Sequence, residues 1–395
     1  MRVAIDTRAL RPPLTGIGHF VHRLMDAMLP LLTPDETLLS FNGWRIESLD
    51  RHFLARTEAR NSNQVSANSA RSARHLANGA LALLRQIYLL RRGYRAMQAS
   101  FFLHAEKSFD LFHAANFVTP ATPNKPVLPL IHDLSHIRHP QAHPKERVEW
   151  LEAQLKLLLG MPYLQTVSQF CKSEIIAVFG VSPDRIYVTY AAPGAHFRPD
   201  RDDDEACLRS YKLVSGKYLL VVGTREPRKN FNTLAEAYAT LPAAMQAHFP
   251  LVWAGPPGWG DLALSPAVER AKEIGQIRLI GYVPDRELAA LYRNTALFVM
   301  PSIYEGFGMP VVEAMACGAR VALSRIPVFK EIAGSYGQYI DPMDIEGWRQ
   351  VIKDAIDEGP GAVDARRAPP DLTRFSWHSS AVTTLDLYRR LAQGK

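Results

Sequence analysis

The sequence predicts an α/β protein built from two doubly wound, Rossmann-like domains that face a central cleft. A chain of 395 residues is longer than one hydrophobic core usually serves. Short apolar runs alternate with helical patterns in both halves, and a loop that can hold an anion follows the first strand-like run of each half. We expect an N-terminal domain over residues 1–198, a polar linker near residues 199–205, a C-terminal domain over residues 205–375 and a terminal helix over residues 376–395.

The composition is that of an ordinary globular protein, with 47% hydrophobic and 22% charged residues. The three cysteines, Cys171, Cys207 and Cys317, have no metal-ligand spacing, which argues against a disulfide framework and fits a reducing compartment. No apolar segment precedes the first strand and no apolar run approaches the length of a bilayer span, so we expect neither a signal peptide nor a transmembrane helix. These features predict a cytoplasmic protein.

The first strand is predicted over residues 2–6, and a loop with Gly16 and Gly18 follows it. A helix is predicted to start near His19. This order of strand, glycine loop and helix can direct backbone N–H groups at an anion. The third glycine of a dinucleotide-binding fingerprint is missing, and a tight turn without a ligand accounts for the two glycines about equally well.

Positive charge is concentrated in one part of the N-terminal half. Residues 1–198 hold 23 Lys and Arg against 15 Asp and Glu, whereas the remainder holds 23 against 24. Residues 51–107 alone hold 10 basic and 2 acidic side chains. A local basic patch of this kind indicates an anionic partner such as a membrane surface, a lipid pyrophosphate or a nucleic acid.

Two segments make up the basic patch. Residues 51–80 are polar, and we expect part of them to form a loop. Residues 85–103 are predicted to form a basic amphipathic helix. Its apolar stripe consists of Ile87, Leu90, Tyr94, Met97 and Phe101, and its arginines are Arg85, Arg91, Arg92 and Arg95. Most such stripes face a core, and a role at the membrane surface is the alternative.

Further strands are predicted over residues 110–113 and 127–133, the second ending in His132. Functional side chains gather at the carboxyl ends of strands in parallel α/β domains, although a lone histidine is more often structural. Helices are predicted over residues 145–159 and 168–179.

The second domain is predicted to begin with a strand over residues 217–224, followed by the basic pair Arg228 and Lys229 and a helix over residues 231–241. Arginine offers a fork to phosphate oxygens and lysine a compact charge, so the pair at a strand end is interpreted as a diphosphate clamp. A solvated loop is the alternative. Strands over 251–255, 277–281 and 320–324 follow.

The most informative stretch follows a predicted strand over residues 296–300. A glycine-containing loop leads to a helix that starts near Pro310 and ends before Gly318. Glu305 lies in the loop and Glu313 in the first part of the helix. Loop amides and the positive helix end favour a phosphate, and carboxylates accept bonds from sugar hydroxyls. The alternative is a tight turn with two solvated glutamates.

The string Glu-Gly-Phe-Gly-Met-Pro-Val-Val-Glu-Ala-Met-Ala-Cys-Gly over residues 305–318 resembles retaining glycosyltransferase family 4, which has the GT-B fold, and especially its bacterial mannosyltransferase-like members. Residues 15–18, 130–135, 166–170 and 223–230 carry the same resemblance. It implies retaining transfer of a hexose from a nucleotide diphosphate sugar, with GDP-mannose or a GDP-linked deoxyhexose favoured. The acceptor implied is a glycan, linked to a lipid pyrophosphate, in bacterial lipopolysaccharide O-antigen or capsule synthesis.

The resemblance also implies a role for each site residue. Arg228 and Lys229 would hold the leaving diphosphate, Glu305 the transferred sugar and Glu313 the ribose, while His132 would contact sugar or acceptor. The expected catalytic residues are His132, Arg228, Lys229 and Glu305. The expected donor site comprises Gly16, Gly223, Thr224, Arg228, Lys229, Tyr282, Val283, Glu305, Gly306, Phe307, Gly308, Met309 and Glu313. In this fold the terminal helix packs back on the first domain.

No carboxylate, histidine or cysteine set has metal-ligand spacing, so neither a metal nor a cofactor is expected. Arg85, Arg91, Arg92 and Arg95 are expected to face the acceptor and the inner surface of the cytoplasmic membrane. Two alternatives stay open. A GT-B nucleotide-sugar epimerase would hold the same diphosphate, and a nucleic-acid binder would use the basic patch. The sequence shows no platform of interleaved aromatic and basic residues, which nucleic-acid binding would need. We therefore expect no nucleic-acid partner.

Overall fold

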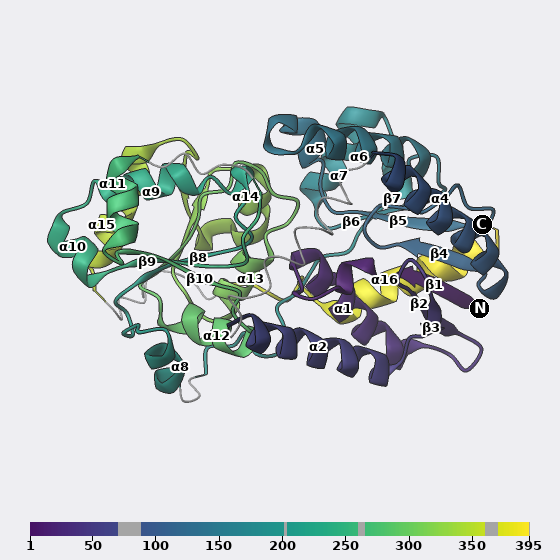
Figure 1. Cartoon of the computed structure of the whole chain (residues 1–395), viewed down its shortest axis with the longest axis horizontal. Helices are drawn as coiled ribbons and strands as arrows, with labels where there is room; N and C mark the ends of the chain where they lie inside the picture. Colours follow the sequence, from purple (N-terminus) through teal and green to yellow (C-terminus); the bar gives the residue numbers. More distant parts are fainter. Residues whose placement is uncertain (70–87, 201–203, 260–264, 360–369, 395) are drawn as a thin grey trace.

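The computed structural model describes residues 1–69, 88–200, 204–259, 265–359 and 370–394. The chain forms two parallel sheets, each with helices on its faces, and the two halves lie side by side (Figure 1). The apolar runs of both halves form central strands that are buried on both faces, as expected for parallel sheets. None of the helices in the described part is long and apolar enough to cross a bilayer.

The N-terminal sheet has seven strands in the order β3-β2-β1-β4-β5-β6-β7. All neighbours pair in parallel except β2 and β3, which are antiparallel. The strands are β1 Arg2–Asp6, β2 Thr37–Phe41, β3 Ile46–Ser48, β4 Leu111–Ala114, β5 Val127–Ile131, β6 Leu164–Thr166 and β7 Ile186–Val188. The strand order reverses beside β1, and ligands of open α/β sheets bind at such a point.

The C-terminal sheet has six parallel strands in the order β10-β9-β8-β11-β12-β13. The strands are β8 Leu219–Val222, β9 Leu251–Ala254, β10 Ile277–Gly281, β11 Leu297–Met300, β12 Val321–Ser324 and β13 Gln338–Ile340. Here the order reverses between β8 and β11. The loops after these two strands carry the predicted clamp and the predicted glutamate motif.

Helices cover both sheets. Those of the N-terminal half are α1 Gly16–Met28, α2 Arg51–Ser69, α4 Tyr88–Ala105, α5 Ser135–Arg138, α6 Lys145–Leu158 and α7 Gln169–Phe179. Those that follow are α8 Asp204–Ser210, α9 Phe231–Ala239, α10 Ala243–His248, α11 Pro266–Glu273, α12 Asp285–Asn294, α13 Met309–Ala316, α14 Pro327–Ala333, α15 Ile345–Asp357 and α16 Trp377–Ala392. Two short 3₁₀ turns, η1 Arg8–Leu10 and η6 Pro227–Lys229, belong to the site loops.

The last helix, α16, returns to the N-terminal sheet and lies beside α1 (Figure 1). Ser376 caps it by accepting a hydrogen bond from the backbone N–H of Ser379. The Tyr388 hydroxyl lies 2.6 Å from His113 Nδ1 on β4, inside the core. The final helix therefore ties the end of the chain to the first sheet. The residue limits given above for the domains stay a prediction.

The first helix begins earlier than predicted. It starts at Gly16, directly after Thr15, rather than near His19. A Cβ on Gly18 would lie 2.6 Å from the carbonyl oxygen of Ala9, so only glycine lets α1 pack this closely on the preceding turn. Both glycines therefore belong to the helix, and the loop that faces the cleft is shorter than expected.

Part of residues 51–80 was expected to form a loop, and within this segment residues 51–69 form the helix α2. The buried side chains of its described part are Phe53, Leu54, Thr57 and Asn61, and the steps from Leu54 to Thr57 and from Thr57 to Asn61 are three and four residues. Packing of these side chains outweighs the poor helix propensity of a polar segment. Residues 70–87, which include Arg85 and Ile87, lie outside the described residues.

Helix α4 matches the prediction in its extent but presents a different face. Tyr94 and Met97, which were predicted to share the stripe with Phe101, are 47% and 64% exposed. The side chains that reach the core are Gln98 and Phe102, and the Phe102 ring packs against Phe112 at 4.8 Å between centroids. The prediction that the stripe faces the core is therefore wrong at Tyr94 and Met97. The aromatic cluster under α4 packs against Phe102 instead.

The linker is also shorter than predicted. Asp204 begins α8 and is buried, and its carboxylate pairs with Arg293 of α12, with 2.8 Å between Oδ2 and Nε. Asp204 therefore packs with the C-terminal half and is not part of the linker.

Candidate active site

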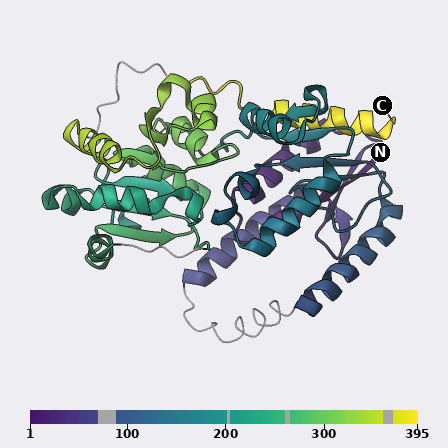
Figure 2. The same ribbon diagram turned by 90° about the horizontal axis from the view of Figure 1, so that it is seen from above.

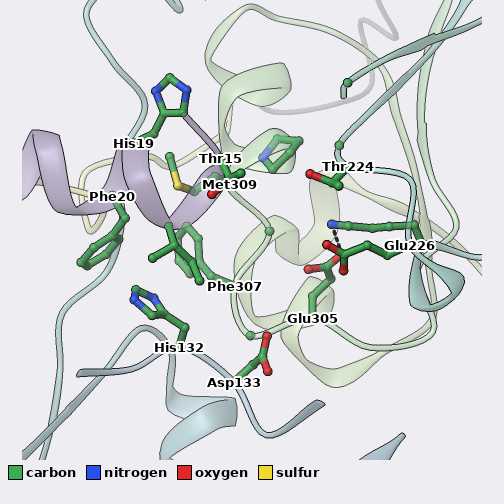
Figure 3. Close-up of a pocket in the computed structure, with 18 of the residues that line it drawn as sticks. Thr15, His19, Phe20, His132, Asp133, Thr224, Glu226, Glu305, Phe307 and Met309 are labelled. Atoms are coloured by element: carbon green, nitrogen blue, oxygen red, sulfur yellow. Dashed lines mark hydrogen bonds and ion pairs between the residues drawn. The ribbon is translucent and has the colours of Figure 1, made fainter. Parts of the chain in front are cut away.

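A cleft of about 720 Å³ separates the two sheets. Its walls come from the start of α1, the segment after β5, the turns after β8 and β10, and the start of α13. Figure 3 shows His132 and Asp133 entering the pocket from the N-terminal half and Glu305 entering it from the C-terminal half. Each wall lies at the carboxyl end of a sheet, where parallel α/β proteins bind ligands.

Two cations form the centre of the C-terminal wall, and we call Arg228 and Lys229 the cation clamp. Arg228 Nη1 lies 2.7 Å from Glu305 Oε2, and Lys229 Nζ lies 2.6 Å from Glu305 Oε1. Arg228 Nε also pairs with Glu226 at 2.8 Å. The backbone N–H of Ile303 donates to the carbonyl of Arg228, which joins the clamp turn to the glutamate loop. The clamp is therefore fixed before any ligand arrives.

The carboxylate that holds the clamp is itself buried. Glu305 is 6% exposed, and its Oε1 also accepts a hydrogen bond from Ser302 at 2.8 Å. Burial opposes ionisation, but the charges of Arg228 and Lys229 outweigh it and hold the pKa of Glu305 at about 2. Glu305 is thus ionised at neutral pH, and both of its oxygens bind cations.

The loop that leads into α13 depends on two glycines. A Cβ on Gly306 would lie 1.9 Å from the carbonyl oxygen of His132, so the two halves of the protein touch here. Gly308 has a φ of +105°, which other residues rarely adopt, and it immediately precedes the eight-residue helix. The loop therefore brings the positive end of α13 close to the N-terminal wall.

The N-terminal wall carries His132 and Asp133 at the end of β5. His132 Nε2 donates a hydrogen bond to the carbonyl of Ala115 at 2.9 Å, and burial lowers the pKa of the imidazole. Asp133 Oδ1 accepts from the backbone N–H of Ser135 at 2.9 Å. Burial would raise the pKa of Asp133, but the charge of Arg228 across the cleft holds it below its usual value. A neutral histidine and an ionised carboxylate thus face the clamp.

Glu313 lies partly buried on α13. Burial, together with the negative charge of Asp285, raises the pKa of Glu313 to about 8. The Tyr292 hydroxyl lies 3.3 Å from Glu313 Oε2. Asp285 itself is paired with Arg23 of α1. At neutral pH Glu313 is therefore mostly protonated, and it can both donate and accept hydrogen bonds with a hydroxyl group.

A contact between the two halves lies beside Glu313. Asn61 Oδ1 accepts from the backbone N–H of Leu14, and Asn61 Nδ2 donates to the hydroxyl of Tyr282 at 2.8 Å. Helix α2 of the N-terminal half thus contacts the turn after β10, and Figure 2 shows this helix, in purple, extending towards the C-terminal half. Asn61 was not predicted as a site residue, because part of residues 51–80 was expected to form a loop.

Comparison with known proteins identifies the family. Residues 209–368 match the family model described as "Glycosyl transferases group 1". The O-antigen chain mannosyltransferase B of Escherichia coli is 33% identical over 398 residues, which cover 99% of this chain and 100% of that protein. The chain belongs to the group 1 glycosyltransferases.

One further relative and one solved structure are also similar to this glycosyltransferase. The serotype-specific mannosyltransferase WbdA of Escherichia coli is 31% identical over 232 residues, which cover 58% of this chain and 28% of that protein. The structure titled Anabaena Alr3699/HepE in complex with UDP and glucose superposes with a TM-score of 0.64 at 15% identity, covering 100% of this chain and 99% of that one. The predicted GT-B fold of two Rossmann-like domains is confirmed, and family membership favours the transferase over the epimerase alternative.

The cleft of this glycosyltransferase brings the predicted donor and catalytic residues together. Those that line it are Gly16, His132, Gly223, Thr224, Arg228, Lys229, Tyr282, Val283, Glu305, Gly306, Phe307, Gly308, Met309 and Glu313. The lining also contains Asp133 and Asp285, which the predicted site left out. The strand-end position of Asp133, next to His132, was the signal that could have identified it.

Of the predicted acceptor arginines, Arg85 lies outside the described residues. Arg91 and Arg92 belong to α4. The guanidinium of Arg95 lies over the ring of Trp150, 5.3 Å from its centroid, and Trp150 lines the cleft. Within the described residues no three His, Cys, Asp or Glu side chains cluster as metal ligands would. Metal independence stays a prediction.

Proposed function

We propose that this glycosyltransferase is a retaining mannosyltransferase of O-antigen synthesis. It moves mannose, or a related deoxyhexose, from a GDP-sugar to a glycan acceptor on a lipid pyrophosphate. The observation that carries the proposal is the cation clamp, held by buried Glu305 of the loop before α13 and facing His132 and Asp133 across the cleft. The names of the E. coli relatives support the sugar and the pathway.

The clamp would act on the leaving group. The bond between the sugar C1 and the phosphate oxygen breaks, and negative charge develops on the departing diphosphate. Arg228, Lys229 and the positive end of α13 stabilise that charge in fixed positions, which lowers the barrier. Both Glu305 oxygens bind cations, which supports a role for this carboxylate in positioning the clamp. This role is in addition to its predicted contact with the transferred sugar.

The acceptor would attack on the face that the diphosphate leaves. The acceptor hydroxyl forms the new C1–O bond, and its proton passes to the leaving phosphate oxygen, so the anomeric configuration is retained. This route needs no nucleophile from the enzyme and no metal. We therefore assign no nucleophilic side chain.

Donor recognition would rest on the opposite end of the cleft. Glu313, protonated at neutral pH, suits a ribose hydroxyl because it can both donate and accept a hydrogen bond. Tyr282 and Val283, which line the same part of the cleft, suit the base. The neutral imidazole of His132 suits a hydroxyl of the transferred sugar or of the acceptor.

The enzyme would work at the inner face of the cytoplasmic membrane. Helix α4 exposes Tyr94, Met97 and Leu103 on the surface of the N-terminal half, and Arg91, Arg92 and Arg95 belong to the same helix. Apolar and cationic side chains on one helix suit the surface of an anionic bilayer.

A donor and acceptor panel tests the function. The purified protein is incubated with GDP-mannose, other GDP-sugars and UDP-sugars, each with a lipid pyrophosphate-linked glycan and with EDTA present. We expect transfer from a GDP-sugar, an α-linked product by NMR from the α-linked donor, and no loss with EDTA. An inverted product, or activity that returns only with Mg²⁺ or Mn²⁺, would contradict the mechanism.

A further inference from the structure

A second cavity, of about 360 Å³, lies in the N-terminal half outside the cleft. It is enclosed by η1 and the segment after it, by the turn between β2 and β3, and by α2. Its lining includes Arg11, Asn42, Trp44, Arg45, Glu47 and Arg60, none of which takes part in the donor site. We call it the arginine cavity. Its volume is within the range of small-ligand pockets.

The charges around the arginine cavity are not balanced. Nearby Arg8 is neutralised by Asp6, with contacts of 2.9 and 2.8 Å. Glu47, the carboxylate in the lining, lies 3.6 Å from Arg56, which is not part of the lining. Within the described part of the chain, no carboxylate pairs with Arg11, Arg45 or Arg60. Three guanidinium groups and one carboxylate therefore border the cavity, which leaves an excess of positive charge.

The walls of the cavity are fixed by hydrogen bonds. Asn42 Oδ1 accepts from the backbone N–H groups of Trp44 and Arg45, both at 3.0 Å. Arg11 Nη2 donates to the carbonyl of Asn42 at 3.3 Å. The Trp44 indole N–H donates to the Tyr94 hydroxyl of α4. The hairpin turn, the segment after η1 and helix α4 thus form one rigid rim.

The arginine cavity and the active-site cleft share a wall. Leu10, Arg11 and Pro12 line the cavity, whereas Leu14 and Thr15 of the same segment line the cleft. A molecule whose reacting end lies in the cleft could therefore place a charged end a short distance away, behind this segment. The cavity also meets α4, the helix with exposed apolar side chains, through the bond between Trp44 and Tyr94.

We propose that the arginine cavity binds the phosphoryl groups of a lipid-linked molecule. Arginine forks match phosphate oxygens, and three of them without carboxylate partners suit a group with two negative charges. The source is either the pyrophosphate of the glycan acceptor or the phosphate of a membrane lipid. Assignment to the acceptor rests on the proposed function, whereas phosphate binding does not.

The first test measures binding directly. Wild-type protein and the variant Arg11→Gln/Arg45→Gln/Arg60→Gln are titrated with inorganic pyrophosphate by calorimetry. We expect the wild type to bind at two sites and the variant to keep only the site at the cation clamp. Arg56→Gln, a neighbouring arginine outside the lining, serves as the control and should keep both. Each single variant is measured as well, in case the triple variant does not fold. Equal binding by all of these proteins would overturn the proposal.

The second test identifies the source of the phosphate. One glycan is offered on a lipid pyrophosphate and on an uncharged linker. If the cavity binds the acceptor, the triple variant raises the acceptor KM at least tenfold for the first substrate only, while kcat and the donor KM stay unchanged. If it binds a membrane lipid, the variant instead loses sedimentation with phosphatidylglycerol vesicles that lack acceptor.

Either result supports a phosphoryl site in the arginine cavity. If the triple variant behaves like the wild type in both assays, the proposal is refuted. Absence of transfer by the wild type would contradict the proposed function and leave the calorimetric result standing.

Discussion

The cation clamp and the arginine cavity hold positive charge in different ways. Arg228 and Lys229 have side chains that are 15% and 12% exposed, and both contact the carboxylate of Glu305. Arg11, Arg45 and Arg60 are exposed and have no carboxylate partner among the described residues. The positive charges of the cation clamp are buried and paired with a carboxylate. Those of the arginine cavity are exposed and are not paired with one.

Under the functions proposed above, the cation clamp suits catalysis and the arginine cavity suits capture of an anion. Buried cations need a fixed counter-charge, because an unpaired charge away from water is costly. Buried cations that have such a counter-charge are held in fixed positions. They can stabilise negative charge that develops in a transition state, and salt screens them weakly. Exposed arginines need no such partner, and they attract an anion from solution at a strength that falls with ionic strength. The following predictions test this contrast, from the largest effect to the smallest.

The largest effect is expected from removing the counter-charge of the clamp. Glu305→Gln leaves buried Lys229 without an anion and Arg228 with Glu226 alone, which should lower the free energy of unfolding by about 3–5 kcal/mol. Denaturant unfolding measures the change. Glu226→Gln is the matched control, because Glu226 contacts Arg228 but makes no ion pair with Lys229. If the two variants unfold alike, Glu305 does not organise the clamp.

Removal of Lys229 should impair the reaction while preserving the fold. In Lys229→Ala, Glu305 keeps Arg228 as its partner, so the protein should fold. Loss of one fixed charge at a developing anion typically lowers kcat by roughly 10²–10³-fold. Lys272→Ala, an exposed lysine of the same half, should turn over normally. Near-normal turnover of folded Lys229→Ala would contradict the clamp.

The clamp itself illustrates what sequence can and cannot reveal. Residues 305–318 are contiguous, so the strand, the loop, the helix and the two glutamates could be predicted together. The contact between Arg228 and Glu305 joins residues 77 positions apart, and no local pattern encodes it. Both were predicted as donor ligands, but their mutual ion pair became visible only in the folded chain.

The N-terminal half was harder to predict. In α2, the buried positions Phe53, Thr57 and Asn61 are spaced among polar residues, so composition concealed the helix. In α4, Phe101 and Phe102 are adjacent, and only the aromatic cluster beneath the helix decides which of them is fully buried. Tertiary packing outweighs local pattern in both helices.

An intermediate effect is expected at Glu313, which is partly buried and, unlike Glu305, has no cation bound to it. Its pKa of about 8 in the folded state lies above the ordinary value of 4.5. Its contribution to stability is therefore fully present below pH 4.5 and is lost as pH rises through about 8. Glu313→Gln should flatten the fall in Tm between pH 4.5 and pH 8. Exposed Glu269→Gln is the control, and equal pH slopes in wild type and Glu313→Gln would contradict the assignment.

Glu313 should also affect nucleotide affinity. Glu313→Ala removes a group suited to a ribose hydroxyl, so calorimetric titration with the donor nucleotide should give weaker binding. Glu313→Gln should retain more affinity, because an amide also donates and accepts hydrogen bonds. Unchanged affinity in the alanine variant would make Glu313 a structural residue.

The smallest effect per residue is expected from the arginines of α4. Each cation near an anionic membrane surface contributes about 1 kcal/mol, and salt screens it. Arg91→Gln/Arg92→Gln/Arg95→Gln should therefore reduce sedimentation with phosphatidylglycerol vesicles at low salt, whereas transfer to a short soluble acceptor should change little. High salt should release the wild type in the same way. Arg138→Gln, a surface arginine paired with Glu174, is the control and should sediment normally. If the wild type does not sediment even at low salt, α4 does not face the membrane, and the exposure of Tyr94 and Met97 must serve another partner.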